Sequence, residues 1–245
     1  DTPFGTRWWV VGDRLHPRAT RDEAHHPSLE RRELRDVEGR VQDMDRMGVA
    51  TQIIFPTFFI RYGASDAETE AALTSAYNRW IAEATETSHG RLRWVALLPL
   101  MSMDGALEEL RWAKDHGACG VLKKGAECGR SAADPYFFPL YEEASRLDIP
   151  ICIHTGTGNP PAREAIQLSG KFNAISAFTD LVMGGVPERF PELRTGWIET
   201  GASWVPFLSA DLAAKHAKLT FRPFDSKEDL FRGYRFYVAC DSSDD

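Results

Sequence analysis

Six short apolar segments recur along this sequence, and at least one stretch with helical periodicity separates each segment from the next. We expect strands at residues 51–55, 94–98, 118–122, 150–153, 193–198 and 236–240. Nearly continuous apolar strands joined by helices are typical of a parallel sheet that is buried on both faces. A barrel and an open doubly wound sheet both satisfy this α/β pattern. No glycine-rich phosphate turn follows the first strand, which disfavours a nucleotide-binding open sheet.

The segments between the strands carry signals for helix ends. Asp66 is the expected N-cap of a helix that runs to about residue 88, and Asp104 is the expected N-cap of a later helix. Residues 1–30 lack a regular pattern, so we expect an irregular insertion or lid there. The whole sequence, 1–245, is predicted to form a single domain.

Composition narrows the classes of partner. The chain has a formal net charge of -7 and no basic stripe, which argues against a nucleic-acid partner. No apolar run is long enough to span a bilayer and no signal peptide is visible, which argues against a membrane partner. The four cysteines are scattered without CxxC spacing, which argues against a disulfide framework and a cysteine-type zinc site. A reducing, cytoplasmic location is therefore expected.

Ionisable residues follow four successive candidate strands. Reactive side chains of a barrel lie where its strands end and its loops begin. The residues at these ends are Lys123 and Lys124, then His154, then Glu199, then Asp241. Their side chains are predicted to converge at one end of the barrel, with His154 and Glu199 as the catalytic candidates and all five as candidate metal ligands.

These residue types suit a site for one or two divalent ions. A neutral imidazole and carboxylates bind zinc, manganese or iron, and the sequence does not select among the three metals. A lysine becomes an oxygen ligand only if CO₂ carboxylates its amine, which would allow it to bridge two ions. Each residue also has an explanation that involves no metal. His154 would then be a hydrogen-bonded structural histidine, the lysines would be solvated, and Asp241 would cap a following helix.

Candidate substrate-binding residues lie near the same strand ends. Phe58, Phe59 and Trp204 are predicted to line an apolar pocket, although ordinary core packing explains them equally well. Arg61 or Arg130 is a candidate for holding a substrate carboxylate, and a solvated surface position is the alternative for each.

Three runs of the sequence resemble a known family. Residues 134–144, 149–154 and 184–193 resemble, in the same order, the amidohydrolase family that includes aminocarboxymuconate-semialdehyde decarboxylase and the resorcylate-type decarboxylases. The resemblance implies a distorted (β/α)8 TIM barrel, a divalent metal, a small-molecule substrate and a homodimer. It also implies that 1–245 is one metal-dependent hydrolase-type barrel domain, with His154 at the family's fifth-strand metal histidine.

The sequence departs from that family at three places. The HxH or ExH metal pair of the family's first strand has no match, and the metal-binding Asp of its last strand is expected beyond this sequence. We therefore expect the first and last barrel strands to be missing from this chain. The family's sixth-strand histidine is replaced by Glu199.

Three functions remain open from the sequence. The leading hypothesis is hydrolysis, in which a metal-activated hydroxide attacks an ester, thioester or amide carbonyl of a small, largely apolar acid derivative. Glu199 would then be a metal ligand or the base that handles the proton. The alternative is non-oxidative decarboxylation of an aromatic or enoic acid. The third is a non-catalytic barrel that serves binding or assembly.

Overall fold

A parallel sheet of six strands forms the centre of the molecule. The computed structural model describes residues 7–11, 14–18, 28–61, 63–156, 170–220, 227–241 and 244. The sheet order is β3-β4-β5-β6-β7-β8, so each strand pairs with the next along the chain. The strands are β3 (Gln52–Ile54), β4 (Leu92–Ala96), β5 (Gly120–Lys124), β6 (Ile151–His154), β7 (Thr195–Ile198) and β8 (Phe236–Val238).

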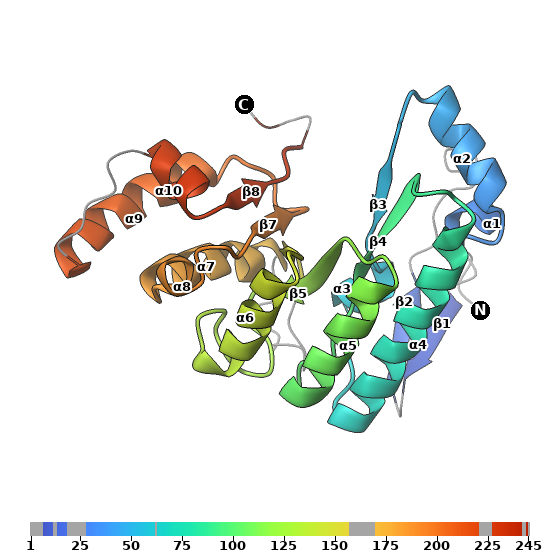
Figure 1. The fold of residues 1–245 in the computed structure, drawn as a ribbon, viewed down its shortest axis with the longest axis horizontal. Helices are drawn as coiled ribbons and strands as arrows, with labels where there is room; N and C mark the ends of the chain where they lie inside the picture. The colour runs from blue at the N-terminus through green and yellow to red at the C-terminus, as the bar shows by residue number, and fades with distance from the viewer. Residues whose placement is uncertain are drawn as a thin grey trace.

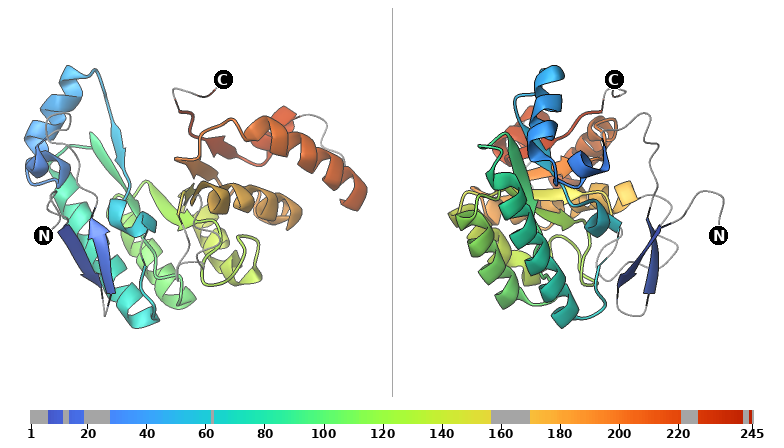
Figure 2. Two further views of the ribbon diagram at one scale, coloured as in Figure 1. Left: turned by 180° about the vertical axis from the view of Figure 1, so that it is seen from behind. Right: turned by 90° about the vertical axis from the view of Figure 1, so that its right-hand side faces the viewer.

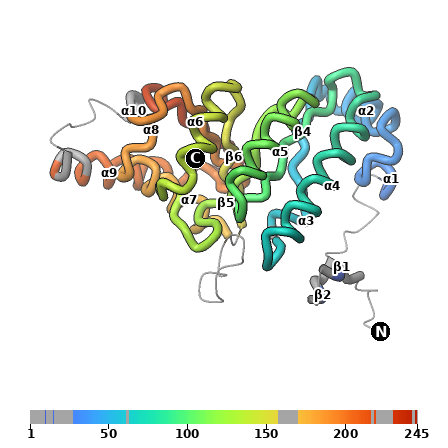
Figure 3. The backbone as a smooth tube through the Cα atoms, turned by 60° about the horizontal axis from the view of Figure 1, so that its bottom comes forward, coloured from blue at the N-terminus to red at the C-terminus, as the bar shows by residue number. Residues whose placement is uncertain are grey.

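Helices precede and connect the strands of the sheet (Figure 1). Those before β5 are α1 (Leu29–Arg32), α2 (Val37–Arg46), α3 (Thr57–Arg61), α4 (Ala67–Glu86) and α5 (Met103–Asp115). Those after β5 are η2 (Pro135–Phe137), α6 (Phe138–Arg146), α7 (Gly170–Met183), α8 (Val186–Arg189), α9 (Val205–Thr220) and α10 (Lys227–Gly233). Helices α4, α5 and α6 run side by side (Figure 3).

The sheet is curled into a half-barrel and does not close in the described part of the chain. Its edge strands β3 and β8 lie on opposite sides of the opening (Figure 2) and do not pair with each other. Six parallel strands, each joined to the next through a helix, make up part of a (β/α)8 barrel. The predicted fold class and all six predicted strands are therefore confirmed.

The two faces of the sheet have different surroundings. On the outer face, Val121, Ile153 and Trp197 are buried in the larger hydrophobic core, against the helices. On the inner face, Leu122 and Cys152 belong to a smaller apolar cluster that faces the interior of the half-barrel. Because side chains alternate along a strand, the next inner-facing positions lie two residues further on.

Two local predictions need correction. Residues 7–11 and 14–18 were expected to be irregular, but they form the strands β1 (Arg7–Val11) and β2 (Arg14–Arg18), which pair antiparallel. The helix α5 is capped by the side chain of Ser102, which accepts a hydrogen bond from Gly105, and not by Asp104. The N-cap at Asp66 is confirmed, since its carboxylate accepts a hydrogen bond from the backbone of Thr69 at 2.8 Å.

None of the described helices has the length and apolar character needed to cross a bilayer.

Candidate metal centre

His154 is the last residue of β6 and points into the half-barrel. It is only 2% exposed, and its ring lies 5.3 Å from that of Phe55, centroid to centroid. Its Nδ1 lies 3.0 Å from the carbonyl oxygen of Thr155, which can only accept a hydrogen bond. The proton of a neutral imidazole therefore sits on Nδ1, and Nε2 keeps a lone pair for a metal or a proton.

Glu199 directly follows β7 and reaches the histidine. Its Oε2 lies 3.7 Å from Nε2 of His154. Glu199 adopts a left-handed backbone conformation with φ of 59°, which is uncommon for a residue with a side chain and often accompanies functional positions. Its side chain is 66% exposed, whereas that of His154 is 3% exposed. One member of the pair is thus fixed in the protein and the other is open to solvent.

Burial favours the neutral form of His154. Burial lowers the pKa of His154 below its ordinary value of 6.5, and the neighbouring Lys124 acts in the same direction. The hydrogen bond to Thr155 and the carboxylate of Glu199 oppose this shift but do not reverse it. A neutral imidazole is the form that binds metals.

The structure separates the two lysines at the end of β5. Lys124 pairs in register with His154 on the neighbouring strand, and it lies on the inner face, two residues beyond Leu122. It is 3% exposed, and burial lowers the pKa of Lys124. Lys124 is therefore the lysine that shares a face with the histidine.

Lys123 lies on the opposite face, in contrast to its prediction as a metal ligand. Its Nζ donates hydrogen bonds to the carbonyl oxygens of Lys124 and Gly125 at 2.9 and 2.7 Å. It also lies 4.3 Å from the ring centroid of Phe137 in the outer core. Alternation along the strand places it there, and its two hydrogen bonds stabilise the loop after β5.

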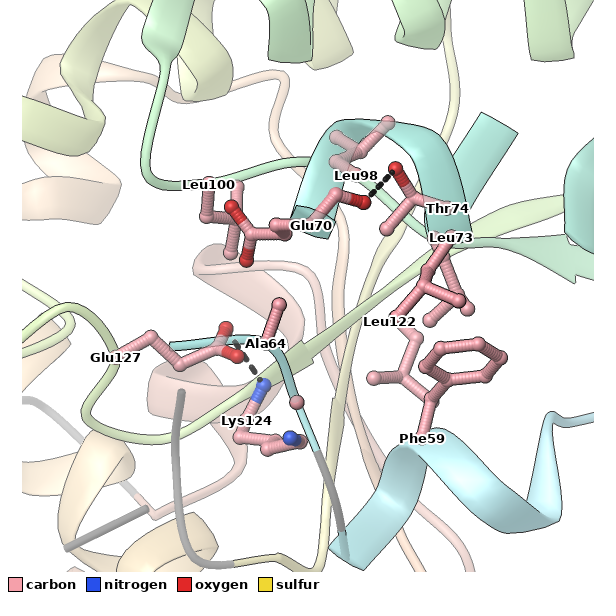
Figure 4. Close-up of a pocket in the computed structure, with 12 residues that line it drawn as sticks. Phe59, Ala64, Glu70, Leu73, Thr74, Leu98, Leu100, Leu122, Lys124 and Glu127 are labelled. Carbon is pink, nitrogen blue, oxygen red and sulfur yellow. Dashed lines mark hydrogen bonds between the residues drawn. The ribbon is translucent and has the colours of Figure 1, made fainter. Parts of the chain in front are cut away.

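A small cavity adjoins Lys124 on the inner side of the sheet (Figure 4). Its volume of about 30 Å³ has room for a water molecule or two. Two buried carboxylates line it together with Lys124. Oε2 of Glu127 accepts a hydrogen bond from the backbone N–H of Lys124 at 3.1 Å, and Oε2 of Glu70 accepts one from Met101 at 2.7 Å. Burial raises the pKa of Glu127.

Sequence reasoning missed both carboxylates. Glu127 stands only three residues after Lys124, and this short spacing could have indicated that the two side chains lie close together. Glu70 occupies the first turn of α4, where an acidic residue has the ordinary explanation of favourable interaction with the helix dipole.

Asp241 lies three residues beyond β8 and is exposed. Its carboxylate is 3.7 Å from the ammonium of Lys171, and its backbone N–H donates to Asp244 at 2.6 Å. Asp244 also accepts a hydrogen bond from Ala202, so Asp241 is near the loop that follows Glu199. No contact joins it to the histidine in the described structure, and its role as a ligand stays a prediction.

The predicted substrate-binding residues divide between the two faces. Phe59 lines the cavity and packs on the inner cluster, and Phe58 contacts its ring edge-on at 5.1 Å. Trp204 instead packs in the outer core, 5.2 Å from the ring of Phe178, so its assignment to the pocket is corrected. Arg61 ends α3, and its side chain lies outside the described part of the structure.

Arg130 is held away from the histidine by other partners. Its guanidinium stacks over Tyr136 at 4.6 Å and lies 3.5 Å from Asp134. Its side chain is 44% exposed, which matches the surface alternative.

The donors fit a divalent ion as a partial ligand set. Two metal–ligand bonds of about 2.1 Å each exceed the 3.7 Å between Nε2 of His154 and Oε2 of Glu199, so one ion can contact both. Across the described residues, no group of three or more His, Cys, Asp and Glu side chains is close enough to hold an ion. The described chain thus offers two adjacent donors, and a catalytic zinc site typically uses three.

Comparison with known proteins identifies the fold and its relatives. The family model described as amidohydrolase matches residues 20–222. The 2-amino-3-carboxymuconate-6-semialdehyde decarboxylase of Dictyostelium discoideum is 26% identical over 179 residues. That alignment covers 70% of this chain and 49% of the relative, so the chain spans about half the length of the curated relative it matches.

Solved structures share the fold at low sequence identity. An amidohydrolase from Mycobacterium avium subsp. paratuberculosis K-10 aligns with a TM-score of 0.74 and 21% identity, over 94% of this chain and 63% of the other. A dihydroxybenzoic acid decarboxylase from Polaromonas sp. JS666, with bound manganese and the inhibitor 2-nitroresorcinol, aligns with a TM-score of 0.68 and 19% identity. That match covers 90% of this chain and 73% of the other.

Proposed function

The chain belongs to the amidohydrolase family, and on that basis we propose that the protein is a metal-dependent, non-oxidative decarboxylase of an aromatic or enoic carboxylic acid. The observation that carries the proposal is the close approach of a buried, neutral His154 to a solvent-exposed Glu199 at the ends of neighbouring strands. The decarboxylases among the similar proteins support this reaction over hydrolysis.

The inner face of the sheet suits the loss of CO₂. Leu97, Leu122 and Cys152 form its apolar cluster, and Phe59 packs against them. An apolar surface beside the site disfavours a charged carboxylate and favours neutral CO₂. The aromatic rings also offer flat contacts to a planar substrate.

His154 would hold the ion through Nε2, while Thr155 fixes the tautomer that leaves this atom free to bind. A bound divalent ion supplies a Lewis acid that holds the substrate's oxygen atoms and withdraws charge from them. The 2% exposure of His154 suits a ligand that must not change orientation.

Glu199 would carry the proton. In decarboxylation the bond between the carboxylate carbon and its neighbour breaks, CO₂ leaves, and the electron pair left on the neighbour takes up one proton. A carboxyl group that is 66% exposed can deliver this proton and then recover one from water. The exposure of Glu199 suits a proton carrier better than a buried metal ligand.

Hydrolysis is a second candidate because of one observation. Lys124 lies on the same face as His154, is buried, and has a lowered pKa. A neutral amine is the form that reacts with CO₂ to give a carboxylated lysine, and such a group would bridge two ions beside the histidine. A two-metal hydrolase would then need two ions per active chain.

The test combines products and metal content. Purified protein loaded with Mn²⁺ or Zn²⁺ is incubated with a panel of hydroxybenzoates and enoic acids, and with esters, thioesters and amides of the same acids. We expect one CO₂ per acid consumed, no hydrolysis, and one ion per fully active chain. Hydrolysis of the derivatives without release of CO₂ from any acid would overturn the decarboxylase proposal, and two ions per chain would support the hydrolase.

A further inference from the structure

Asn173, in the first turn of α7, connects the two loops that follow Lys124 and His154. Its Oδ1 accepts a hydrogen bond from the backbone N–H of Ala126 at 2.8 Å. Its Nδ2 donates to the carbonyl oxygen of Gly156 at 2.9 Å. The side chain is buried, at 8% exposure, so it bridges the β5 loop and the β6 loop from inside the protein.

The backbones around this bridge are packed without room for extra atoms. A Cβ on Gly125 would lie 1.7 Å from the carbonyl oxygen of Asn173, so α7 approaches the β5 loop as closely as only glycine permits. The N–H of Gly156 also donates to the carbonyl of Gly170 at 3.2 Å, at the start of the same helix. The start of α7 is thus fixed to both loops.

Asn173 is connected to His154 through two intermediate residues. Asn173 holds Gly156, and Gly156 follows Thr155, whose carbonyl accepts the Nδ1 hydrogen bond of His154. Loss of the bridge would remove one restraint on the carbonyl that orients the imidazole, while the backbone hydrogen bonds of Thr155 to the end of β7 and of Gly156 to the start of α7 would persist.

We propose that Asn173 is a positioning residue, which holds the β5 and β6 loops together and thereby orients His154 toward its ion. This inference rests on the proposed function and deepens it, since it names a residue that acts on the ion only through Gly156 and Thr155. Asn173 itself touches neither the histidine ring nor Glu199 among the contacts of the described residues.

The chain offers a matched control at Asn78. This residue is also a buried helical asparagine, at 0% exposure, and it bridges α4 to the residue that directly follows β4. Its Nδ2 donates to the carbonyl of Leu97 at 2.7 Å, and its Oδ1 accepts from the N–H of Leu97 at 3.0 Å. Its Nδ2 also donates to Oε1 of Glu109 at 2.8 Å. Asn78 therefore stabilises the fold through buried amide hydrogen bonds, at a segment that carries none of the candidate ligands.

The experiment compares Asn173→Ala, Asn173→Asp and Asn78→Ala in the otherwise unchanged protein. Asn173→Asp keeps an acceptor for the N–H of Ala126 but removes the donor to Gly156. We measure the melting temperature, amide hydrogen exchange in both loops, Mn²⁺ affinity by calorimetry, and kcat/KM for release of CO₂. Because outer residues that orient ligands typically change metal affinity by about 10–100-fold, we expect a loss of at least about tenfold in both Asn173 variants.

The expected results distinguish a role of Asn173 in orienting His154 from a role in the stability of the fold. Asn173→Asp should speed exchange in the β6 loop while Ala126 stays protected, and Asn78→Ala should lower the melting temperature with less than about a twofold change in Mn²⁺ affinity. Equal losses of affinity in the Asn173 and Asn78 variants, or none in either, would overturn the inference. A wild-type protein that binds Mn²⁺ but releases no CO₂ overturns the proposed function alone, because the affinities still decide the role of Asn173. A wild type that binds no Mn²⁺ overturns both.

Discussion

Nε2 of His154 lies 3.7 Å from Oε2 of Glu199, across the pairing of β6 with β7. The histidine is buried and oriented by a backbone carbonyl, whereas the carboxylate faces solvent and belongs to a residue with a left-handed backbone conformation. This contrast assigns the two residues different roles, with His154 as the fixed ligand and Glu199 as the group that exchanges protons.

His154→Asn is expected to remove the bound ion. Asparagine keeps a polar side chain but does not place a lone pair where Nε2 lies, so Mn²⁺ affinity should fall by more than the roughly 10–100-fold seen when ligand-orienting neighbours are lost. Calorimetric titration with Mn²⁺ and elemental analysis measure the effect. His116→Asn is the matched control, since His116 is exposed and stacks on Trp112 at 3.9 Å. Unchanged Mn²⁺ affinity in His154→Asn would exclude this residue as a ligand.

Glu199→Gln is expected to retain the ion and lose the reaction. Glutamine cannot deliver a proton, and loss of a general acid typically slows a reaction by about 10²–10⁴-fold. The rate of CO₂ release and the metal content are measured on the same sample, with Glu192→Gln as an exposed control whose partner is Arg235. Loss of the ion together with the rate would instead identify Glu199 as a ligand.

Lys124→Met and Lys123→Met are expected to leave the metal content at one ion per chain. Methionine fills a similar volume on either face, so each substitution removes the amine with little change in packing. Lys123→Met should lower the free energy of unfolding by about 2–3 kcal/mol, because it leaves the carbonyls of Lys124 and Gly125 without their donor. Elemental analysis and urea unfolding measure the two effects. A second ion in the wild type that disappears only in Lys124→Met would support the carboxylated lysine.

Gly125→Ala is expected to separate α7 from the β5 loop. The added Cβ would meet the backbone of Asn173 at 1.7 Å, and a backbone atom cannot move aside as a side chain does. We expect the free energy of unfolding to fall by more than about 3 kcal/mol, since overpacking typically costs about 1–3 kcal/mol where side chains can adjust. Gly233→Ala is the control, because no atom lies within 4 Å of its added Cβ. Similar unfolding curves for the two variants would contradict the close packing.

The fold could be predicted from the sequence because local patterns determine its strands. All six parallel strands lie within a few residues of the apolar segments. The connections between them are long enough for the helical crossovers that parallel strands need. The helical stretch before β3 is broken into α1 and α2, since Leu34 between them has a φ of 56°. No apolar pattern indicates such a break.

The candidate site could be predicted only in part. Strand ends indicated His154 and Glu199, because the ends of parallel strands meet on one side of the sheet. The choice between Lys123 and Lys124 required the register, since consecutive residues face opposite sides. Asn173 could not be found, because its partners are 47 and 17 residues away and only the packed helix brings them together.

Glu143→Gln is expected to destabilise the protein at neutral pH but not in acid. Hydrogen bonds from Arg146 and then from Arg111 lower the pKa of Glu143 from 4.5 to about 2, so the folded state holds this carboxylate charged more strongly than the unfolded state does. A lowered pKa gives stability that is complete above the ordinary value and is lost as the pH falls through the folded value. Both arginine side chains are at least half exposed, so solvent screening limits the effect to about 1–2 kcal/mol.

Urea unfolding of the wild type and of Glu143→Gln from pH 7 down to pH 2 measures this difference. The two free energies of unfolding should converge between about pH 4.5 and about pH 2, because protonated glutamate and glutamine then present the same neutral group to the arginines. Glu142→Gln, on the same helix, is the control for the loss of a carboxylate from α6. A difference that stays constant down to pH 2 would mean that the charge of Glu143 does not account for its contribution to stability.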